Sequence, residues 1–330
     1  MFAHANNIGA KMSNIIKLGF ILSAGIIFAV GTALAAPRVD PIRFVHQETA
    51  PSDLFPPPEH QPSRAERVTR ALVEAYPRRV ERAEYRGGDW AVLLRGIWFY
   101  YAGGRMMPEH LLYRAEYYSP IAFHDNYPKE LPPWSPPSYE QAERLLYMTI
   151  NRATHIKPRA HYFFDTLYRA HDHDEAYQRV KTLRFLGHQV LVHHAILEEL
   201  SLVEEKILAA ARIDPQVRAW MNNIRTVEGW SWRTIAGTQT RSLHSYGIAI
   251  DLIPRVTGGR EQFWRWAADR REDWWNIPHS GRYHPPQAVI SAFESLGFIW
   301  GGKWLFFDTM HFEFRPEVFI LNGIEMSTLR

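Results

Sequence analysis

Residues 241–251 read RSLHSYGIAID, and this stretch decides how the last third of the chain is interpreted. It places His244 seven positions before Asp251, with Gly247 between them, where a residue without a Cβ permits a sharp turn. Beyond the turn, the alternating pattern predicts a strand with apolar residues on one face and Asp251 on the other. A turn followed by such a strand can bring the histidine and the aspartate to one point.

A second short stretch, residues 308–313, reads DTMHFE. It offers a second histidine, His311, and a carboxylate, Asp308, three positions before it. Taken with His244 and Asp251, the two stretches supply two histidines and an aspartate as ligands. Three protein ligands are the number that a catalytic zinc ion uses when it keeps its fourth position for water.

The composition limits the chemistry that the chain can perform. Among its 330 residues there is no cysteine, so any metal must be held by His, Asp and Glu. A thiol nucleophile, a disulfide framework and a Cys-ligated zinc site are excluded for the same reason. The 38 basic residues against 35 acidic ones give a formal net charge of +3, which argues against nucleic-acid binding.

The pattern SxHxxGxAxD over 242–251, followed by DxxHFE over 308–313, resembles the M15 family of zinc peptidases. The segments WRTIAG at 232–237 and GFIWGGKW at 297–304 are similar to that family's approaches to the two motifs. The resemblance covers about 217–318. The family includes D-alanyl-D-alanine carboxypeptidases and dipeptidases, and the L-alanyl-D-glutamate endopeptidases of phage endolysins.

The resemblance implies an α+β fold, a small zinc-peptidase domain with an antiparallel sheet of the Hedgehog/DD-peptidase type. It also implies one Zn²⁺ per chain, held by His244, Asp251 and His311. Asp308 stands at the family's base position and would take a proton from the attacking water. Many carboxypeptidase members have Glu at this position, so an aspartate favours the endopeptidase branch.

The resemblance assigns further roles around these residues. Arg233 would stabilise the substrate carbonyl as it becomes an oxyanion, although Arg241 is close enough in sequence to do the same. Ser242, Tyr246 and Glu313 would contact the substrate or orient a ligand. By contrast, the histidine- and aspartate-rich stretch 171–174 is interpreted as solvated surface.

The N-terminal residues 1–35 form a predicted signal peptide. Two lysines, Lys11 and Lys17, precede an apolar run, and the small-x-small site at 33–35 suits cleavage before Ala36. Because the apolar run is long, an uncleaved membrane anchor is the competing interpretation. Residues 36–62 are Pro-rich and indicate a linker. We therefore expect an exported protein of the periplasm or cell envelope, with membrane contact only if the leader remains.

Residues 63–212 are predicted to be mostly helical, with a role that the sequence does not define. Capping boxes begin helices at Ser63 and Ser138. The other helices are predicted at 90–101 and 175–211. Near 212–216 the pattern changes from helical segments to short strand-like runs separated by Gly-rich turns. Residues 213–330 are therefore predicted to be the α+β peptidase domain, with short strands at 235–240, 248–253, 298–300 and 306–314.

The predicted function is that of an exported zinc metallopeptidase that hydrolyses peptide bonds in peptidoglycan stem peptides, as a D,D-carboxypeptidase or an L-alanyl-D-glutamate endopeptidase. The alternative is a non-catalytic, zinc-containing module for cell-wall binding or envelope structure on the same fold. The sequence leaves open which peptide bond is cut, whether the leader is cleaved, and the oligomeric state.

Overall fold

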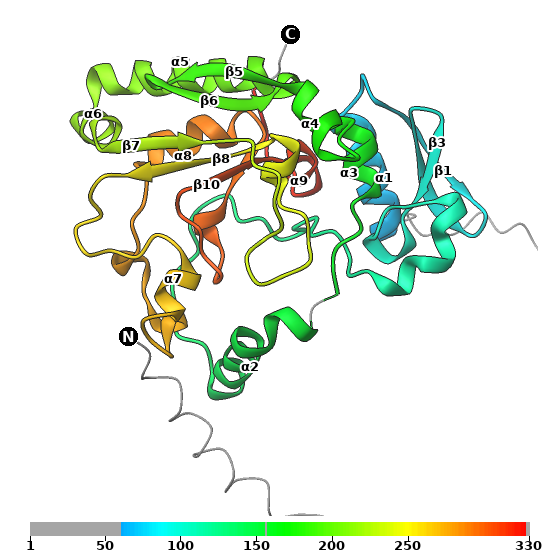
Figure 1. Ribbon diagram of the computed structural model, residues 1–330, viewed down its shortest axis with the longest axis horizontal. Helices are drawn as coiled ribbons and strands as arrows, with labels where there is room; N and C mark the ends of the chain where they lie inside the picture. Colours follow the sequence, from blue (N-terminus) through cyan, green and yellow to red (C-terminus); the bar gives the residue numbers. More distant parts are fainter. Residues whose placement is uncertain (1–60, 156, 328–330) are drawn as a thin grey trace, which may run out of the picture. The chain divides into compact units, whose positions relative to one another are not determined.

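The structure, a computed structural model, describes residues 61–155 and 157–327, with the backbone alone for 152–155. The predicted signal peptide and all but the end of the predicted linker lie outside the described residues. The described residues all belong to one unit by their contacts (Figure 1). No helix in the described part of the chain is both long and apolar enough to cross a membrane.

A four-stranded antiparallel sheet carries both sequence motifs. Its order is β7-β8-β10-β9, with β7 at Ile224–Glu228, β8 at Ala249–Pro254, β10 at His311–Phe314 and β9 at Phe298–Trp300. Two helices, α5 (Leu197–Ile213) and α8 (Gln287–Glu294), pack against each other, and α8 also contacts β9. The Phe293 ring of α8 stacks on Phe312 of β10 at 3.9 Å between centroids. This packing leaves the alternate side chains of β8 and β10 on the opposite face.

A second hairpin forms a separate two-stranded sheet beside β7. It consists of β5 (Val180–Phe185) and β6 (His188–His193), and it bonds to the motif loop through His193 N and Gly247 O at 2.8 Å. Gly247 has a φ of 69°, and a Cβ there would lie 2.8 Å from His193 N. Only glycine therefore suits both the left-handed turn and the close approach of the two backbones.

The N-terminal segment builds a separate sheet on the same core. Helix α1 (Arg64–Ala75) is followed by β1 (Val80–Arg86), β2 (Asp89–Leu94), β3 (Ile97–Tyr100) and β4 (Met107–Pro108), paired in that order. Helix α1 packs on α9 (Pro316–Leu321), and Tyr76 donates a hydrogen bond to Glu317 at 2.7 Å. One apolar core runs from Val68 to Phe314. The predicted boundary at 212/213 therefore does not separate two independently packed units.

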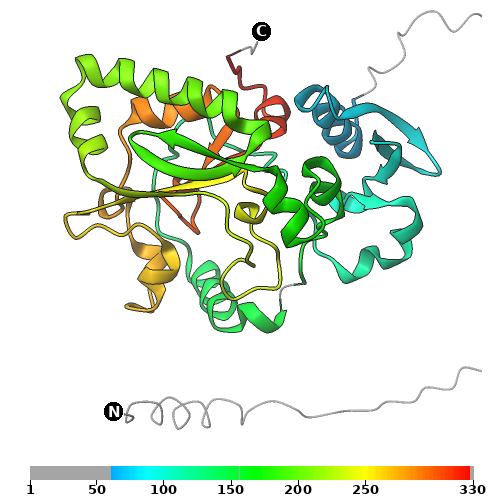
Figure 2. The ribbon, with the colours of Figure 1, turned by 45° about the horizontal axis from the view of Figure 1, so that its top comes forward.

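The remaining α-helices connect these sheets. Figure 2 shows α3 and α4 in green between the β5–β6 hairpin and the blue and cyan N-terminal segment. The bounds are α2 Tyr139–His155, α3 Tyr162–Tyr168, α4 His173–Arg179, α6 Pro215–Asn222 and α7 Trp264–Ala268. The predicted capping boxes are confirmed, because Ser63 Oγ accepts from Glu66 N at 3.1 Å and Ser138 exchanges bonds with Gln141.

The prediction that 63–212 is mostly helical is wrong in two places. The apolar run 90–101 forms strands β2 and β3, which turn at Arg95-Gly96 with φ of 52° and 76°. The stretch 175–211 holds the end of α4, the β5–β6 hairpin and most of α5, and the hairpin turns at Leu186-Gly187. Short apolar runs are compatible with a buried helix or a buried strand. Here the dipeptides Arg95-Gly96 and Leu186-Gly187 have positive φ and form the turns of two hairpins.

Only some of the strand predictions for the C-terminal part are confirmed. The strands at 248–253 and 298–300 are confirmed as β8 and β9 within one residue. The run 235–240 is instead a loop, held at its base by a bridge between Thr234 and Arg241. Within 306–314 only the end, β10, is a strand. The fold is thus α+β with antiparallel sheets, while its Hedgehog/DD-peptidase type stays a prediction.

Candidate metal centre

His244 lies in a buried 3₁₀ turn, Leu243–Tyr246, immediately before Gly247. Ser242 begins this turn, and its Oγ accepts a hydrogen bond from His244 N at 3.3 Å. The imidazole Nδ1 lies 2.6 Å from the carbonyl oxygen of Gly229, to which it can donate only as Nδ1–H. This bond fixes the tautomer and leaves the lone pair of Nε2 available for a metal.

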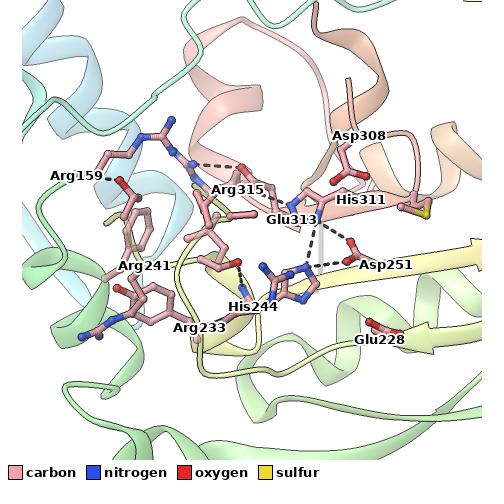
Figure 3. A pocket seen from close by; sticks show the side chains of 18 of the residues that line it. Arg159, Glu228, Arg233, Arg241, His244, Asp251, Asp308, His311, Glu313 and Arg315 are labelled. Atoms are coloured by element: carbon pink, nitrogen blue, oxygen red, sulfur yellow. Dashed lines mark hydrogen bonds and ion pairs between the residues drawn. The ribbon is translucent and has the colours of Figure 1, made fainter. Parts of the chain in front are cut away.

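Asp251 and His311 face His244 from neighbouring strands. They are cross-strand partners in β8 and β10, and both side chains lie beside the His244 ring (Figure 3). His311 Nδ1 is 2.8 Å from Asp251 Oδ1 and 3.3 Å from His244 Nε2. His244 Nε2 is 3.3 Å from Asp251 Oδ2. The predicted ligands are therefore brought together at one point.

These three side chains fit a metal ion. Each offers one donor atom, and the three donors lie within 4.8 Å of one another. Ligands about 2.0–2.1 Å from one tetrahedral zinc ion are separated by roughly 3.3–3.4 Å, close to the two 3.3 Å separations found here. Among the described residues no other group of histidines and carboxylates has this arrangement. The stretch 171–174 is exposed, as predicted, and Asp172 caps α4.

Glu313 holds the far side of the His311 ring. Its Oε2 is 3.2 Å from His311 Nε2, and its Oε1 is 3.5 Å from a guanidinium nitrogen of Arg315. Burial alone would raise the pKa of Glu313, but the hydrogen bond and charge of His311, followed by the charge of Arg315, lower it to about 2. The structure therefore places Glu313 against a predicted ligand histidine, where its hydrogen bond orients the ring.

The carboxylates give the centre a negative character. Burial opposes ionisation of Asp251, yet His244 and His311 hold its pKa well below the usual range. Burial likewise opposes a charge on His311, and its contacts with Asp251 and Glu313 raise the pKa of the ring well above its ordinary value. A site that favours a proton shared between histidine and carboxylates will also favour a divalent cation in the same place.

Asp308 precedes β10 and lines the same pocket as the three predicted ligands. Its Oδ1 is buried and has no hydrogen-bond partner among the described residues. Burial and, secondly, the charge of Asp251 raise the pKa of Asp308 to about 7. A carboxylate beside a metal site that keeps one oxygen unpaired has the capacity to accept a proton from a ligand in the pocket.

The two candidate arginines have different surroundings. Arg241 forms an ion pair with Asp165 at 2.6 Å, donates to Ala170 O at 3.0 Å, and lies over the Trp232 ring. The guanidinium of Arg233 lines the pocket and has no hydrogen-bond or ion-pair partner among the described residues. Arg241 therefore braces the motif loop against α3, while Arg233 is available to a ligand.

Tyr246 and Ser242 line the pocket, and their hydroxyl groups form hydrogen bonds that support the motif loop. Tyr246 is buried and donates to Asp165 Oδ1 at 3.0 Å, beside the ion pair of Arg241. Ser242 is 5% exposed and caps the turn that carries His244. The structure thus places Asp165, a residue that the sequence did not single out, at the centre of the support behind the motif.

The pocket in front of the metal centre has a volume of about 340 Å³. The sequence analysis missed several of its lining residues, which include Arg159, Glu228, Ile253, Phe263, Trp266 and Met310. Arg159 comes from the segment between α2 and α3, and no hydrogen bond or ion pair engages its guanidinium within the described parts of the chain. A single arginine in irregular chain gives no sequence signal, so only the fold reveals its place.

Comparison with protein families agrees with this geometry. Residues 236–314 match a family described as D-alanyl-D-alanine carboxypeptidase, and residues 68–123 match one described only as a domain of unknown function. No curated protein and no solved structure matches the chain. The first match contains His244, Asp251, Asp308 and His311 but begins after Arg233. The resemblance to M15 peptidases is therefore confirmed over residues 236–314, and the match supports an M15-type peptidase domain in this segment.

Proposed function

We propose that this protein is an exported, zinc-dependent peptidase that hydrolyses peptide bonds in peptidoglycan stem peptides. The observation that carries the proposal is the convergence of His244, Asp251 and His311 with Asp308 in one pocket, within the segment that matches the peptidase family. A non-catalytic module would need the ligands alone. The buried, unpaired oxygen of Asp308 favours an enzyme over such a module.

In the proposed hydrolysis the metal, Asp308 and Glu313 have separate roles. A bound zinc ion supplies Lewis-acid polarisation and lowers the pKa of water to near 7. Asp308 accepts a proton from the attacking water and returns it to the nitrogen of the leaving amine. Glu313 keeps His311 oriented throughout, because its carboxylate holds the ring nitrogen that faces away from the other ligands.

Arg233 stabilises the carbonyl oxygen of the scissile bond as it gains negative charge. Its guanidinium lines the pocket, is exposed, and contributes a charge effect on Asp308. A cation at this position stabilises the transition state more than the ground state, since the charge on oxygen develops only during the reaction. Arg241 does not take this role in the proposal, because Asp165 already holds it.

We further propose that the enzyme is of the carboxypeptidase type. The pocket contains a second unpaired guanidinium, that of Arg159, besides Arg233. The other two arginines that line it are engaged: Arg241 is paired with Asp165, and Arg315 is bound to Glu317, Glu313 and Ala122 O. A free guanidinium binds a carboxylate through two parallel hydrogen bonds, which suits the C-terminal end of a stem peptide. This observation outweighs the endopeptidase preference that an aspartate at position 308 suggests.

Mass spectrometry of purified muropeptides tests the proposed function directly. Incubation with the full-length protein and zinc is expected to release a C-terminal D-alanine, and a chelator is expected to abolish the release. Cleavage inside the stem peptide would keep the peptidase and overturn the carboxypeptidase assignment. An absence of any cleaved product with zinc present would reject the enzyme in favour of a binding module.

Replacement of Arg159 with glutamine tests recognition of the carboxylate. We expect kcat/KM for a substrate with a free C-terminal carboxylate to fall by at least about tenfold, mainly through KM, because one charge-assisted contact is lost. The C-terminal amide of the same peptide should be a poor substrate for both proteins. Arg225→Gln, which removes an exposed arginine from β7, is the matched control. Equal discrimination between acid and amide in the variant would refute the assignment.

A further inference from the structure

A second pocket, of about 170 Å³, lies apart from the metal centre. Four arginines line it, together with two histidines and two apolar or aromatic residues, and none of these residues also lines the pocket of the metal centre. The lining consists of Arg79, Arg95, Arg169, Arg179, His193, His194, Leu167 and Tyr168. No acidic side chain is among them.

The four arginines come from four separate segments. Arg79 follows α1, Arg95 lies in the turn between β2 and β3, Arg169 follows α3, and Arg179 ends α4. These elements meet where the N-terminal sheet adjoins α3 and α4 (Figure 2). Because the cluster needs the folded arrangement of all four segments, it is not a local run of basic sequence.

The positive charges in this pocket are only partly compensated by the protein, because the charge of Glu175 acts on Arg95 and Arg179. None of the four guanidinium groups forms an ion pair with a carboxylate in the described part of the chain, and the buried Nε of Arg179 has no hydrogen-bond partner there. Arg95 donates to Thr166 O at 3.1 Å. Burial and then the charges of the other three arginines lower the pKa of Arg95, which shows that the groups repel one another.

The nearby acids are engaged elsewhere or lie outside the pocket. Glu175 accepts hydrogen bonds from the ring and backbone of His171 at 2.6 and 3.0 Å. Glu198 and Glu199 line a different pocket, which Arg79 also lines. The cluster therefore holds excess positive charge that an anion from outside the protein would neutralise.

Two of the four arginines lie where the backbone adopts an unusual conformation. Arg95 and Arg169 have φ of 52° and 50°, in the left-handed region that glycine and asparagine adopt more readily. Arg169 occupies the position after α3 where glycine is most common. Both of these arginines line the same pocket.

We propose that this pocket binds a phosphoryl group, as a free phosphate or as the phosphate of a lipid headgroup. Several guanidinium groups around a small volume match a compact anion with multiple charges and three or four acceptor oxygens. A lone carboxylate would neutralise only one of the four arginines. The site is independent of the peptidase proposal, because it shares no residue with the metal centre.

Titration of the full-length protein with inorganic phosphate and pyrophosphate at constant ionic strength tests the site. Calorimetry should show saturable binding, and the double variant Arg95→Asn/Arg169→Asn should raise Kd by at least about tenfold, since each charge-assisted contact contributes strongly. Asparagine retains the left-handed backbone at both positions, so the variant is expected to fold. The matched control is Arg184→Asn/Arg225→Asn, which removes two exposed arginines from strands outside the pocket.

Vesicles distinguish the two sources of the phosphoryl group. Phosphatidic acid in phosphatidylcholine vesicles should be bound and pure phosphatidylcholine should not, if the ligand is a lipid headgroup. Binding of phosphate, pyrophosphate or these vesicles that is weakened in the double variant but not in the control supports the site and identifies its source. Absence of saturable binding for all three probes, or equal affinity in variant and control, overturns the proposal. The single variant Arg169→Asn serves the same comparison if the double variant does not fold.

Discussion

Replacement of Asp308 with asparagine is expected to lower kcat by about 10²–10⁴-fold, the usual contribution of a general base. Asparagine has nearly the same shape as aspartate, so the pocket should retain its form. Its amide cannot take a proton from water, so the base is lost. Metal content, measured on the purified variant, should remain equal to that of the wild type, because Asp308 is not among the three ligands. A variant with normal kcat would remove Asp308 from the mechanism.

The pH profile separates loss of a base from a structural effect of the same substitution. Burial and Asp251 raise the pKa of Asp308 to about 7 in the absence of a metal, and a bound cation lowers it again. The wild-type kcat/KM should therefore rise with pH up to a midpoint at or below about 7, since the base must be ionised. This rising limb should disappear in Asp308→Asn. A limb that persists unchanged belongs to another group.

Replacement of His244 with alanine is expected to remove both the metal and the activity. His244 supplies one of three donors, and the lost side chain leaves Asp251 and His311 with too few ligands for a stable site. The metal is expected to supply several kcal/mol of transition-state stabilisation, so kcat/KM should fall on the order of 10³-fold or more. Metal analysis and peptidase assays on the same preparation measure the two effects together.

His171→Ala is the control for this experiment. His171 belongs to the histidine-rich stretch 171–174, and its side chain is exposed and bonded to Glu175. Metal content and activity should be unchanged in this variant. The assignment of the metal centre is wrong if His171→Ala loses the metal while His244→Ala keeps it. Circular dichroism of both variants checks that the fold is retained.

The part of the site that the sequence predicted is the part built by short-range geometry. His244 and Asp251 are separated by a glycine turn and one strand, so their spacing alone constrains how they meet. The capping boxes at Ser63 and Ser138 were likewise predictable, because a side chain and a backbone N–H three residues apart suffice for them.

The features that were not predictable depend on contacts between distant segments. The apolar runs of the hairpins β2–β3 and β5–β6 lack a clear period, so they are compatible with a buried helix as well as with a strand. Their turns use Arg95 and Leu186 in place of the usual Asn or Asp, so the sequence does not mark them as turns. Arg159 and Asp165 approach the motif loop only through the packing of α3, which no local pattern encodes.

The single core means that the segment matching the peptidase family depends on the rest of the chain for its packing. Residues 236–314 match a peptidase family, yet their motif loop is bonded to Asp165 and His193, and α9 packs on α1. A fragment cut at 213 would expose the apolar surfaces of the sheet and of α8 and lose a wall of the substrate pocket. The catalytic segment therefore cannot be excised and grafted onto another protein as a portable module. Under the proposed function, substrate choice would depend in part on residues that precede the family match, such as Arg159 and Phe164 in the pocket lining.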